Sequence, residues 1–434
     1  MIGAVRDEAM TATRGWATVL AILLLFAPKI DLIDVPGQTT GLRLDDLVLA
    51  LAALPLLLSY RNLVSDQSLL WICILVALGL ASCAAGDGNV LYVFRIAEYA
   101  VFILLGRFSG CDPARIAGLW LAVQLPIAGL QHFGAIGVFR DGDYMAPIVG
   151  ERASGTTGGP WELAMVTNLA SVVLLATRRS RDSGRVALHL AAMAIMLMTG
   201  SRSGMAVQAF IAFFDACGAR IIPAVSATMV AIVLIVTGDA VIGDRIRGGT
   251  FATTFSDIRE GAHAAATLGS DGQWWATPAA HEVGDDRDAS MAIRAAKWRA
   301  VGNTWAESGP VAWLIGLGNG RFGPAVDGGW VRLLCEGGVL GLAAYAAFIL
   351  HLRRRVQQGW RSLGVPAAAA WSSCLLATFA ANMVFIDVHL SYKTMAFLFL
   401  ILGALSAAAD RPERFAEVAR RLTRPSTPAE PAPA

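Results

Sequence analysis

Residues 191–214 read AAMAIMLMTGSRSGMAVQAFIAFF, and they decide the fold because two apolar runs meet there at a short polar stretch. That stretch, 199–204, is called the TGSRSG segment, and it places Arg202 between two glycines. An arginine at the centre of a bilayer costs about 2.5–3.5 kcal/mol on insertion scales, so the segment is predicted to turn at a membrane surface. Two interpretations remain open. Arg202 either reaches the interface from a hairpin tip, or it lies at a helix end whose donors bind an anion.

The composition excludes most soluble classes of protein. Hydrophobic residues make up 56% of the 434 residues and charged residues only 16%, which is typical of a membrane protein. The net charge of +2 gives no reason to expect a nucleic-acid partner. The six cysteines are scattered without CxxC spacing, so no disulfide framework or zinc site is predicted.

The apolar runs predict an all-α integral membrane protein, a polytopic bundle of about twelve transmembrane helices with one large extracytoplasmic loop. The expected spans are 16–28, 44–60, 68–84, 91–108, 114–139, 160–177, 186–199, 203–217, 221–238, 326–350, 366–385 and 391–409. This divides the chain into transmembrane helices at 1–239, a large outer loop at 240–325, transmembrane helices at 326–409 and a disordered tail at 410–434.

Arginine distribution predicts the orientation. With a cytoplasmic N-terminus, the arginine-rich loops, such as 178–185 and 353–361, all fall inside, as the positive-inside rule requires. An even number of spans also places the C-terminus inside. The loop 140–159, the TGSRSG segment, the long segment 239–325 and Asp327 then share the outer face.

Two parts of the long outer segment suggest contact with a substrate. Residues 289–308 place Met291, Ala295, Trp298, Val301 or Gly302, and Trp305 on one helical face, which predicts an amphipathic helix on the outer membrane surface or over a site. Trp274 and Trp275 are suited to stacking on sugar rings, and equally to a lipid interface. His263, His281, Asp285, Asp286 and Asp288 are interpreted as part of a solvated loop, so no metal or cofactor is predicted.

Three motifs then occur in order. They are RxSGTxxxPxELA at 152–164, the TGSRSG segment, and IGLGNGRFGPAVDGGWVRLLCEGGVLGLAAY at 315–345. Together they resemble the O-antigen polymerase and O-antigen ligase superfamily. The resemblance implies a metal-independent, inverting glycosyl-transfer enzyme at the outer face of the bacterial inner membrane. Its implied partners are an undecaprenyl-pyrophosphate-linked glycan donor, a glycan acceptor and membrane lipid, with a chain-length regulator as a candidate.

Residue chemistry agrees with that implication. Departure of the lipid carrier loads negative charge onto a pyrophosphate, which fixed arginines stabilise. Arg202 and Arg321 are predicted to bind the pyrophosphate, and Arg152 to bind phosphate or substrate. Arg294 and Arg299 are weaker candidates for substrate binding, since basic residues are common on surface helices. Trp274 and Trp275 complete the expected substrate-binding set.

Asp327 is the candidate base that removes the acceptor's proton, and a helix N-cap is its alternative role. Related ligases commonly have histidine then asparagine where this chain has Asp327-Gly328, and polymerase-like relatives more often have aspartate, typically also followed by asparagine. Polymerisation is therefore the expected reaction, with ligation or protein O-glycosylation as the alternative.

Several charged residues are expected to have structural roles. Glu336 is predicted to pair with Arg332 at i, i+4, and Arg95 with Glu98 at i, i+3. Glu162 is expected to cap a helix that begins at Pro160, the alternative being contact with an acceptor sugar. A lipid-linked glycan flippase or transporter is the remaining class, although the candidate charges gather on one face instead of lining a path through the bilayer.

Overall fold

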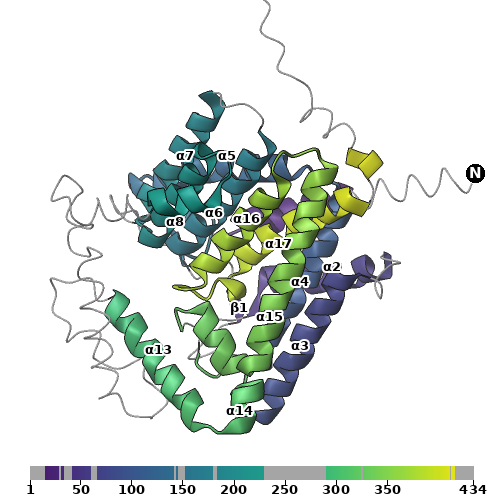
Figure 1. Ribbon diagram of the computed structural model, residues 1–434, viewed down its shortest axis with the longest axis vertical. Coiled ribbons are helices and arrows are strands. Elements are labelled where there is room, and N and C mark those ends of the chain that lie inside the picture. The colour runs from purple at the N-terminus through teal and green to yellow at the C-terminus, as the bar shows by residue number, and fades with distance from the viewer. Residues whose placement is uncertain are drawn as a thin grey trace, which may run out of the picture.

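The computed structural model describes residues 15–28, 31–33, 42–59, 66–140, 143–144, 152–178, 183–228, 290–323, 326–410 and 412–415. The fold over these residues is helical, as the apolar runs predict (Figure 1). Two short antiparallel strand pairs are its β structure there, β1 (Asp31–Ile33) with β2 (Leu42–Arg43) and β3 (Phe139–Arg140) with β4 (Asp143–Tyr144).

The N-terminal part begins with a short apolar helix, Gly15–Phe26. It continues with α2 (Leu44–Ser59), α3 (Gln67–Ala85), α4 (Val90–Ser109), α5 (Pro113–His132), α6 (Pro160–Thr177), α7 (Ser183–Thr199) and α8 (Arg202–Ala216). The C-terminal part consists of α13 (Ser290–Glu307), α14 (Pro310–Ile315), α15 (Gly329–Ser362), α16 (Ala368–Asn382), η1 (Val388–Leu390), α17 (Tyr392–Asp410) and η2 (Pro412–Phe415).

Each predicted span overlaps a helix in the described residues, although residues 229–238 of the span 221–238 lie outside them and two boundaries differ substantially. The span expected at 114–139 ends early, because α5 stops at His132. The span expected at 326–350 is longer, because α15 continues to Ser362 with its arginines in the last turns. Among the described residues, five helices are long and apolar enough to cross a membrane: α3, α5, α6, α15 and α17. The structure is thus compatible with a helical membrane protein.

Helices α6 and α17 form the centre of the bundle. About 89% of the apolar window of each is buried, compared with 33% for α3 and α15. A helix that is apolar on all sides is stable only inside a protein or a bilayer, so the two buried helices act as core and the others keep apolar surfaces that suit lipid. Helix α17 packs closely on α4, where a Cβ at Gly106 would lie 2.2 Å from the Leu400 carbonyl oxygen. Glycine therefore permits this contact between the two backbones.

Charges within the helices are paired as predicted. Arg95 Nη1 lies 3.1 Å from Glu98 Oε1, and it also lies 2.5 Å from Asp46 Oδ1 at the start of α2. A buried guanidinium between two carboxylates is compensated, which is how a charged group is tolerated in such a helix.

Helices α13 and α14 lie at one end of the molecule, beyond the bundle and against the beginning of α15 (Figure 1). Their contact is fixed by two tryptophans: Trp305 Nε1 donates to the Ala312 carbonyl at 3.1 Å, and Trp313 Nε1 donates to the Trp305 carbonyl at 3.0 Å. Val301 of α13 is fully buried in a small cluster with Leu317, Phe322, Val326 and Cys335. A helix is therefore present where one was predicted, and Trp298, Val301 and Trp305 of its predicted apolar face pack on the segment that precedes α15.

Candidate functional site

The connection 316–328 between α14 and α15 carries two of the predicted site residues, Arg321 and Asp327. Part of its fold comes from contacts with residues that lie later in the chain. The backbone N–H of Leu317 donates to the Cys335 carbonyl at 3.0 Å, and that of Gly318 donates to the Glu336 carbonyl at 3.2 Å. The connection therefore folds back on the first turns of α15.

Glu336 fixes the part of this connection that carries Arg321. Its carboxylate accepts the backbone N–H of Gly320 at 2.9 Å and that of Phe322 at 3.4 Å. These two amides flank Arg321 on either side, and the Glu336 side chain is only 5% exposed. The buried carboxylate thus holds the backbone of Arg321 while leaving its side chain free to point outward.

Asp387 fixes the turn that carries Asp327. Its carboxylate accepts three successive backbone N–H groups, from Val326 at 2.8 Å, Asp327 at 3.3 Å and Gly328 at 3.2 Å. Burial would raise the pKa of Asp387, but the charge of Arg332, the neighbouring His389 and the Val326 hydrogen bond outweigh it, so the pKa lies below its ordinary value. A carboxylate that stays ionised is the form that accepts all of these donors.

Arg332 joins the two carboxylates. Its guanidinium is fully buried and lies 3.0 Å from Glu336 through Nε and 3.0 Å from Asp387 through Nη1. Nη2 donates to the Gly323 carbonyl at 2.6 Å. The predicted pairing of Arg332 with Glu336 is confirmed. The contact with Asp387, 55 positions away, is an addition that the helical spacing does not reveal.

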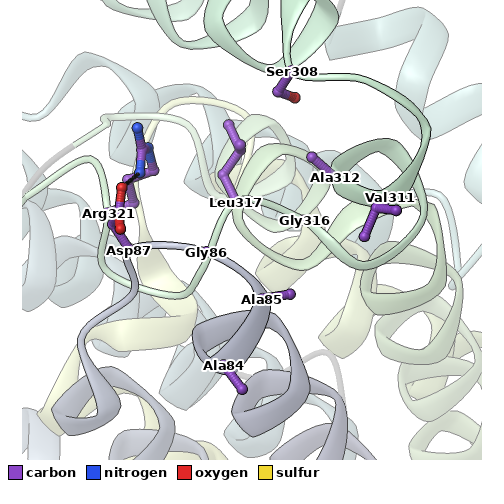
Figure 2. A pocket seen from close by; sticks show the side chains of 10 residues that line it. All are labelled: Ala84, Ala85, Gly86, Asp87, Ser308, Val311, Ala312, Gly316, Leu317 and Arg321. Carbon is purple, nitrogen blue, oxygen red and sulfur yellow. Dashed lines mark hydrogen bonds and ion pairs between the residues drawn. The ribbon is translucent and has the colours of Figure 1, made fainter.

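Arg321 lies at the edge of a pocket of about 450 Å³ between the end of α3 and α14 (Figure 2). The pocket is lined by Ala84, Ala85, Gly86, Asp87, Ser308, Val311, Ala312, Gly316, Leu317 and Arg321. Figure 2 shows the Arg321 guanidinium beside the Asp87 carboxylate, with which it forms an ion pair. Asp87 is 88% exposed, so this pair is a surface contact that contributes at most about 1 kcal/mol.

Asp327 faces α13. Its Oδ2 lies 2.6 Å from Lys297 Nζ, and its carbonyl accepts the Trp298 indole N–H at 3.1 Å. The side chain is 29% exposed. The helix N-cap alternative is wrong, because α15 begins at Gly329 with Gly328 as its cap and Asp327 has a positive φ of 58° one residue earlier. In this conformation the carboxylate points to Lys297 and not to the amides of the helix.

Arg294 and Arg299 lie on the same helix, α13, as Lys297. Arg299 is exposed and Arg294 is half-buried. Trp274 and Trp275 lie outside the described residues, so their predicted role stays a prediction.

Arg152 and the TGSRSG segment are brought together. Arg152 Nε donates to the Thr199 carbonyl at 2.8 Å, and the next residue, Ala153, donates its N–H to the Met198 carbonyl at 2.9 Å. Gly200 turns the chain with a positive φ of 58°, and Ser201 caps α8 by accepting the Gly204 N–H at 3.2 Å. Arg202 is the first residue of α8, a position that both interpretations allow, and anion binding there stays a prediction.

Glu162 has the capping contact that was predicted, and a second role. Its Oε2 accepts the N–H of Gly158, just before α6, at 2.8 Å. Its Oε1 accepts the N–H of Lys393 at 2.9 Å and the Ser391 hydroxyl. The glutamate therefore joins the start of α6 to the start of α17, which supports a structural role.

The predicted residues thus form two groups, and different hydrogen bonds hold each group in place. Arg152 and Arg202 lie at the junction of α7 and α8, whereas Arg321 and Asp327 lie at the start of α15. Sequence reasoning missed Asp87, Lys297 and Asp387. Each contacts its partner over 30 or more positions, where no helical periodicity connects them.

No protein-family model matches the chain, and no curated protein matches it.

Proposed function

We propose that this chain is a bacterial inner-membrane glycosyl-transfer enzyme that polymerises undecaprenyl-pyrophosphate-linked oligosaccharide units into a surface polysaccharide. It spans the membrane about twelve times with both termini in the cytoplasm, and its active site faces the periplasm. The observation that carries the proposal is a set of backbone hydrogen bonds to two buried carboxylates, just before the start of α15. Two buried carboxylates bind the backbone on either side of Arg321 and of Asp327, and both side chains remain partly exposed.

The proposed reaction needs a cation and a base at one boundary. The acceptor hydroxyl oxygen attacks the anomeric carbon of the donor sugar, and the bond from that carbon to the phosphate oxygen breaks with inversion. The pyrophosphate leaves with the bonding electrons, and arginines stabilise its charge. The hydroxyl proton passes to the carboxylate of Asp327. Its ion pair with Lys297 uses Oδ2, so Oδ1 is available to the acceptor.

The contacts of Arg321 suit an anionic ligand. One terminal nitrogen, Nη1, binds Asp87, and the side chain is 32% exposed. Because Asp87 is itself exposed, a pyrophosphate can replace it at small cost and occupy the fork of the guanidinium. Arg152 and Arg202 are proposed as further cations for the same donor, and Arg294 and Arg299 as weaker contacts on α13.

The test uses Arg321→Ala and Asp327→Asn in a strain that lacks the chromosomal gene. Both variants should abolish long polymer while single repeat units still reach the outer surface. Arg355→Ala is the matched control, since Arg355 is also a partly exposed arginine paired with a surface carboxylate, Asp410. The control should leave polymer length unchanged.

The alternatives predict other distributions of product. Free polymer that is never joined to its acceptor would indicate a ligase. Repeat units trapped on the cytoplasmic side would indicate a flippase. Normal polymer in both site variants would refute the proposal.

A further inference from the structure

We infer that Asp387, Glu336 and Arg332 are positioning residues for this reaction: they hold Arg321 and Asp327 at a fixed separation as one rigid unit. This inference rests on the proposed function for its chemistry. Its structural part is independent of that function, since it concerns which backbone segments move together. The three residues are called the Arg332 network.

The hydrogen bonds of the two carboxylates end on the residues that flank Asp327 and Arg321. Asp387 accepts the N–H groups of residues 326, 327 and 328, which include Asp327 and both of its neighbours. Glu336 accepts the N–H groups of residues 320 and 322, the two neighbours of Arg321. Each buried carboxylate therefore fixes the backbone of one proposed reacting residue, on both sides of it.

The backbone of Asp327 is held in the left-handed region. A φ of 58° is uncommon for a residue with a side chain and costs of order 1–3 kcal/mol unless the surroundings impose it. The hydrogen bonds from three successive N–H groups to one carboxylate impose this turn. Its effect is to aim the Asp327 side chain at Lys297, away from the helix that follows.

Arg332 links the two carboxylates. Arg332 is fully buried and contacts Glu336 and Asp387 at 3.0 Å each. Tyr92 of α4 packs against the same guanidinium, which lies 4.8 Å from the centre of its ring. Since the arginine cannot satisfy one carboxylate independently of the other, a displacement at either loop is transmitted to the other loop.

The buried ion pairs of the Arg332 network differ from contacts that only stabilise a fold. Buried ion pairs are often no more stabilising than packed apolar side chains, and their clearest use is to specify one geometry. Here, the two carboxylates accept five backbone N–H groups next to proposed reacting residues. This arrangement favours a role in geometry over a role in stability alone.

Hydrogen–deuterium exchange of the full-length protein in lipid nanodiscs tests the coupling. Asp387→Asn should raise exchange at its own contacts, 326–328, and also at 320–322. Glu336→Gln should likewise raise exchange at 320–322 and at 326–328. Asp215→Asn is the matched control, because Asp215 is also a partly buried carboxylate bound by an arginine, Arg185, and by a histidine, His189. It should affect neither loop.

Two results would overturn the coupling. One is an increase confined to the loop that each carboxylate contacts directly. The other is an equal increase in the Asp215→Asn control. If Asp387→Asn does not accumulate in membranes, Glu336→Gln alone decides, because its distant loop is still observed.

A kinetic cycle tests the link to the reaction. The substrate is lipid-linked repeat unit extracted from a strain that lacks this gene. Asp387→Asn should lower kcat by about 100-fold, the effect of a displacement near 1 Å, and leave KM within about twofold. In the Asp327→Asn background it should cause a smaller loss, because Asp327 is already disabled and only the displacement of Arg321 still affects the rate.

Failure of the positioning role and failure of the proposed function give different results. Full activity of Asp387→Asn, or an equal loss in both backgrounds, refutes the positioning role while leaving the proposed function intact. Full activity of Asp327→Asn itself refutes the proposed function, and the exchange experiment then still decides whether the two loops are coupled.

Discussion

Arg321 and Asp87 form an ion pair across 234 positions of sequence, and the two residues differ in how firmly they are held. Asp87 follows the end of α3 and is 88% exposed, whereas the backbone of Arg321 is fixed by Glu336. An arginine held in place with a weakly bound, exposed partner can exchange that partner for a stronger anion.

Asp87→Asn should therefore strengthen binding of the lipid-linked donor. Removing the competing carboxylate should lower KM by up to about fivefold, the factor that corresponds to ~1 kcal/mol, and leave the thermal midpoint nearly unchanged. The measurement is the initial rate against donor concentration. The change should disappear in an Arg321→Ala background. A higher KM would mean that Asp87 contributes to donor binding.

Two adjacent glycines in α15 should respond oppositely to alanine. Gly338 has a φ of 67°, and a Cβ there would lie 2.4 Å from the Leu314 carbonyl oxygen. Gly338→Ala should therefore be destabilising by more than the ~1–3 kcal/mol of the backbone conformation alone. Around Gly337 a Cβ meets no atom within 4 Å, so Gly337→Ala should be neutral or stabilising by about 0.5–1 kcal/mol. Thermal unfolding in detergent compares the pair, and similar midpoints would contradict this account of Gly338, whose φ and ψ are not helical.

Acid should destabilise the support of the Asp327 turn. Burial, with the charge of Arg332 added, lowers the pKa of His389 to about 4, although Asp387 acts in the opposite direction. Between about pH 6.5 and pH 4 the unfolded chain binds a proton at this histidine that the folded chain does not bind. Stability should thus fall as the pH falls through this window, by on the order of 3 kcal/mol, and the lowered pKa of Asp387 adds a loss in the same direction below about pH 4.

The measurement is the thermal midpoint between pH 7.5 and pH 4.5. His389→Asn should flatten the dependence on pH, because the replacement does not titrate. An unchanged slope in this variant would assign the acid sensitivity to other groups.

Arg152→Lys should loosen the loop that packs on the TGSRSG segment. Lysine lacks the Nε–H group that binds the Thr199 carbonyl at 2.8 Å, so one hydrogen bond worth about 1 kcal/mol is lost although the charge remains. Exchange should rise at the amide of Ala153, which donates to the Met198 carbonyl. Under the proposed function, kcat/KM should also fall. Arg354→Lys, at an exposed position in the last turns of α15, is the control and should affect neither quantity.

Much of the helical architecture could be predicted from the sequence because hydrophobicity is local. The expected span 160–177 agrees with α6, and the pair Arg332 and Glu336 follows from their spacing of four on a helix. The helix expected at 289–308 agrees with α13, where Ala295, Trp298, Val301 and Trp305 of the expected apolar face are buried or partly buried. The end of α5 at His132 was not predicted, because the apolar composition continues past it into 133–139.

The sequence by itself determined where most of the described helices form and which residues carry charge. These properties depend on neighbours within a few turns, and a single chain contains that information. Only the tertiary structure decided that Asp387 binds the Asp327 turn, that Lys297 faces Asp327, and that Asp87 pairs with Arg321. These contacts join positions 60, 30 and 234 residues apart, and their geometry depends on how separate helices pack. No local period encodes that packing, because it results from the burial of many side chains at once.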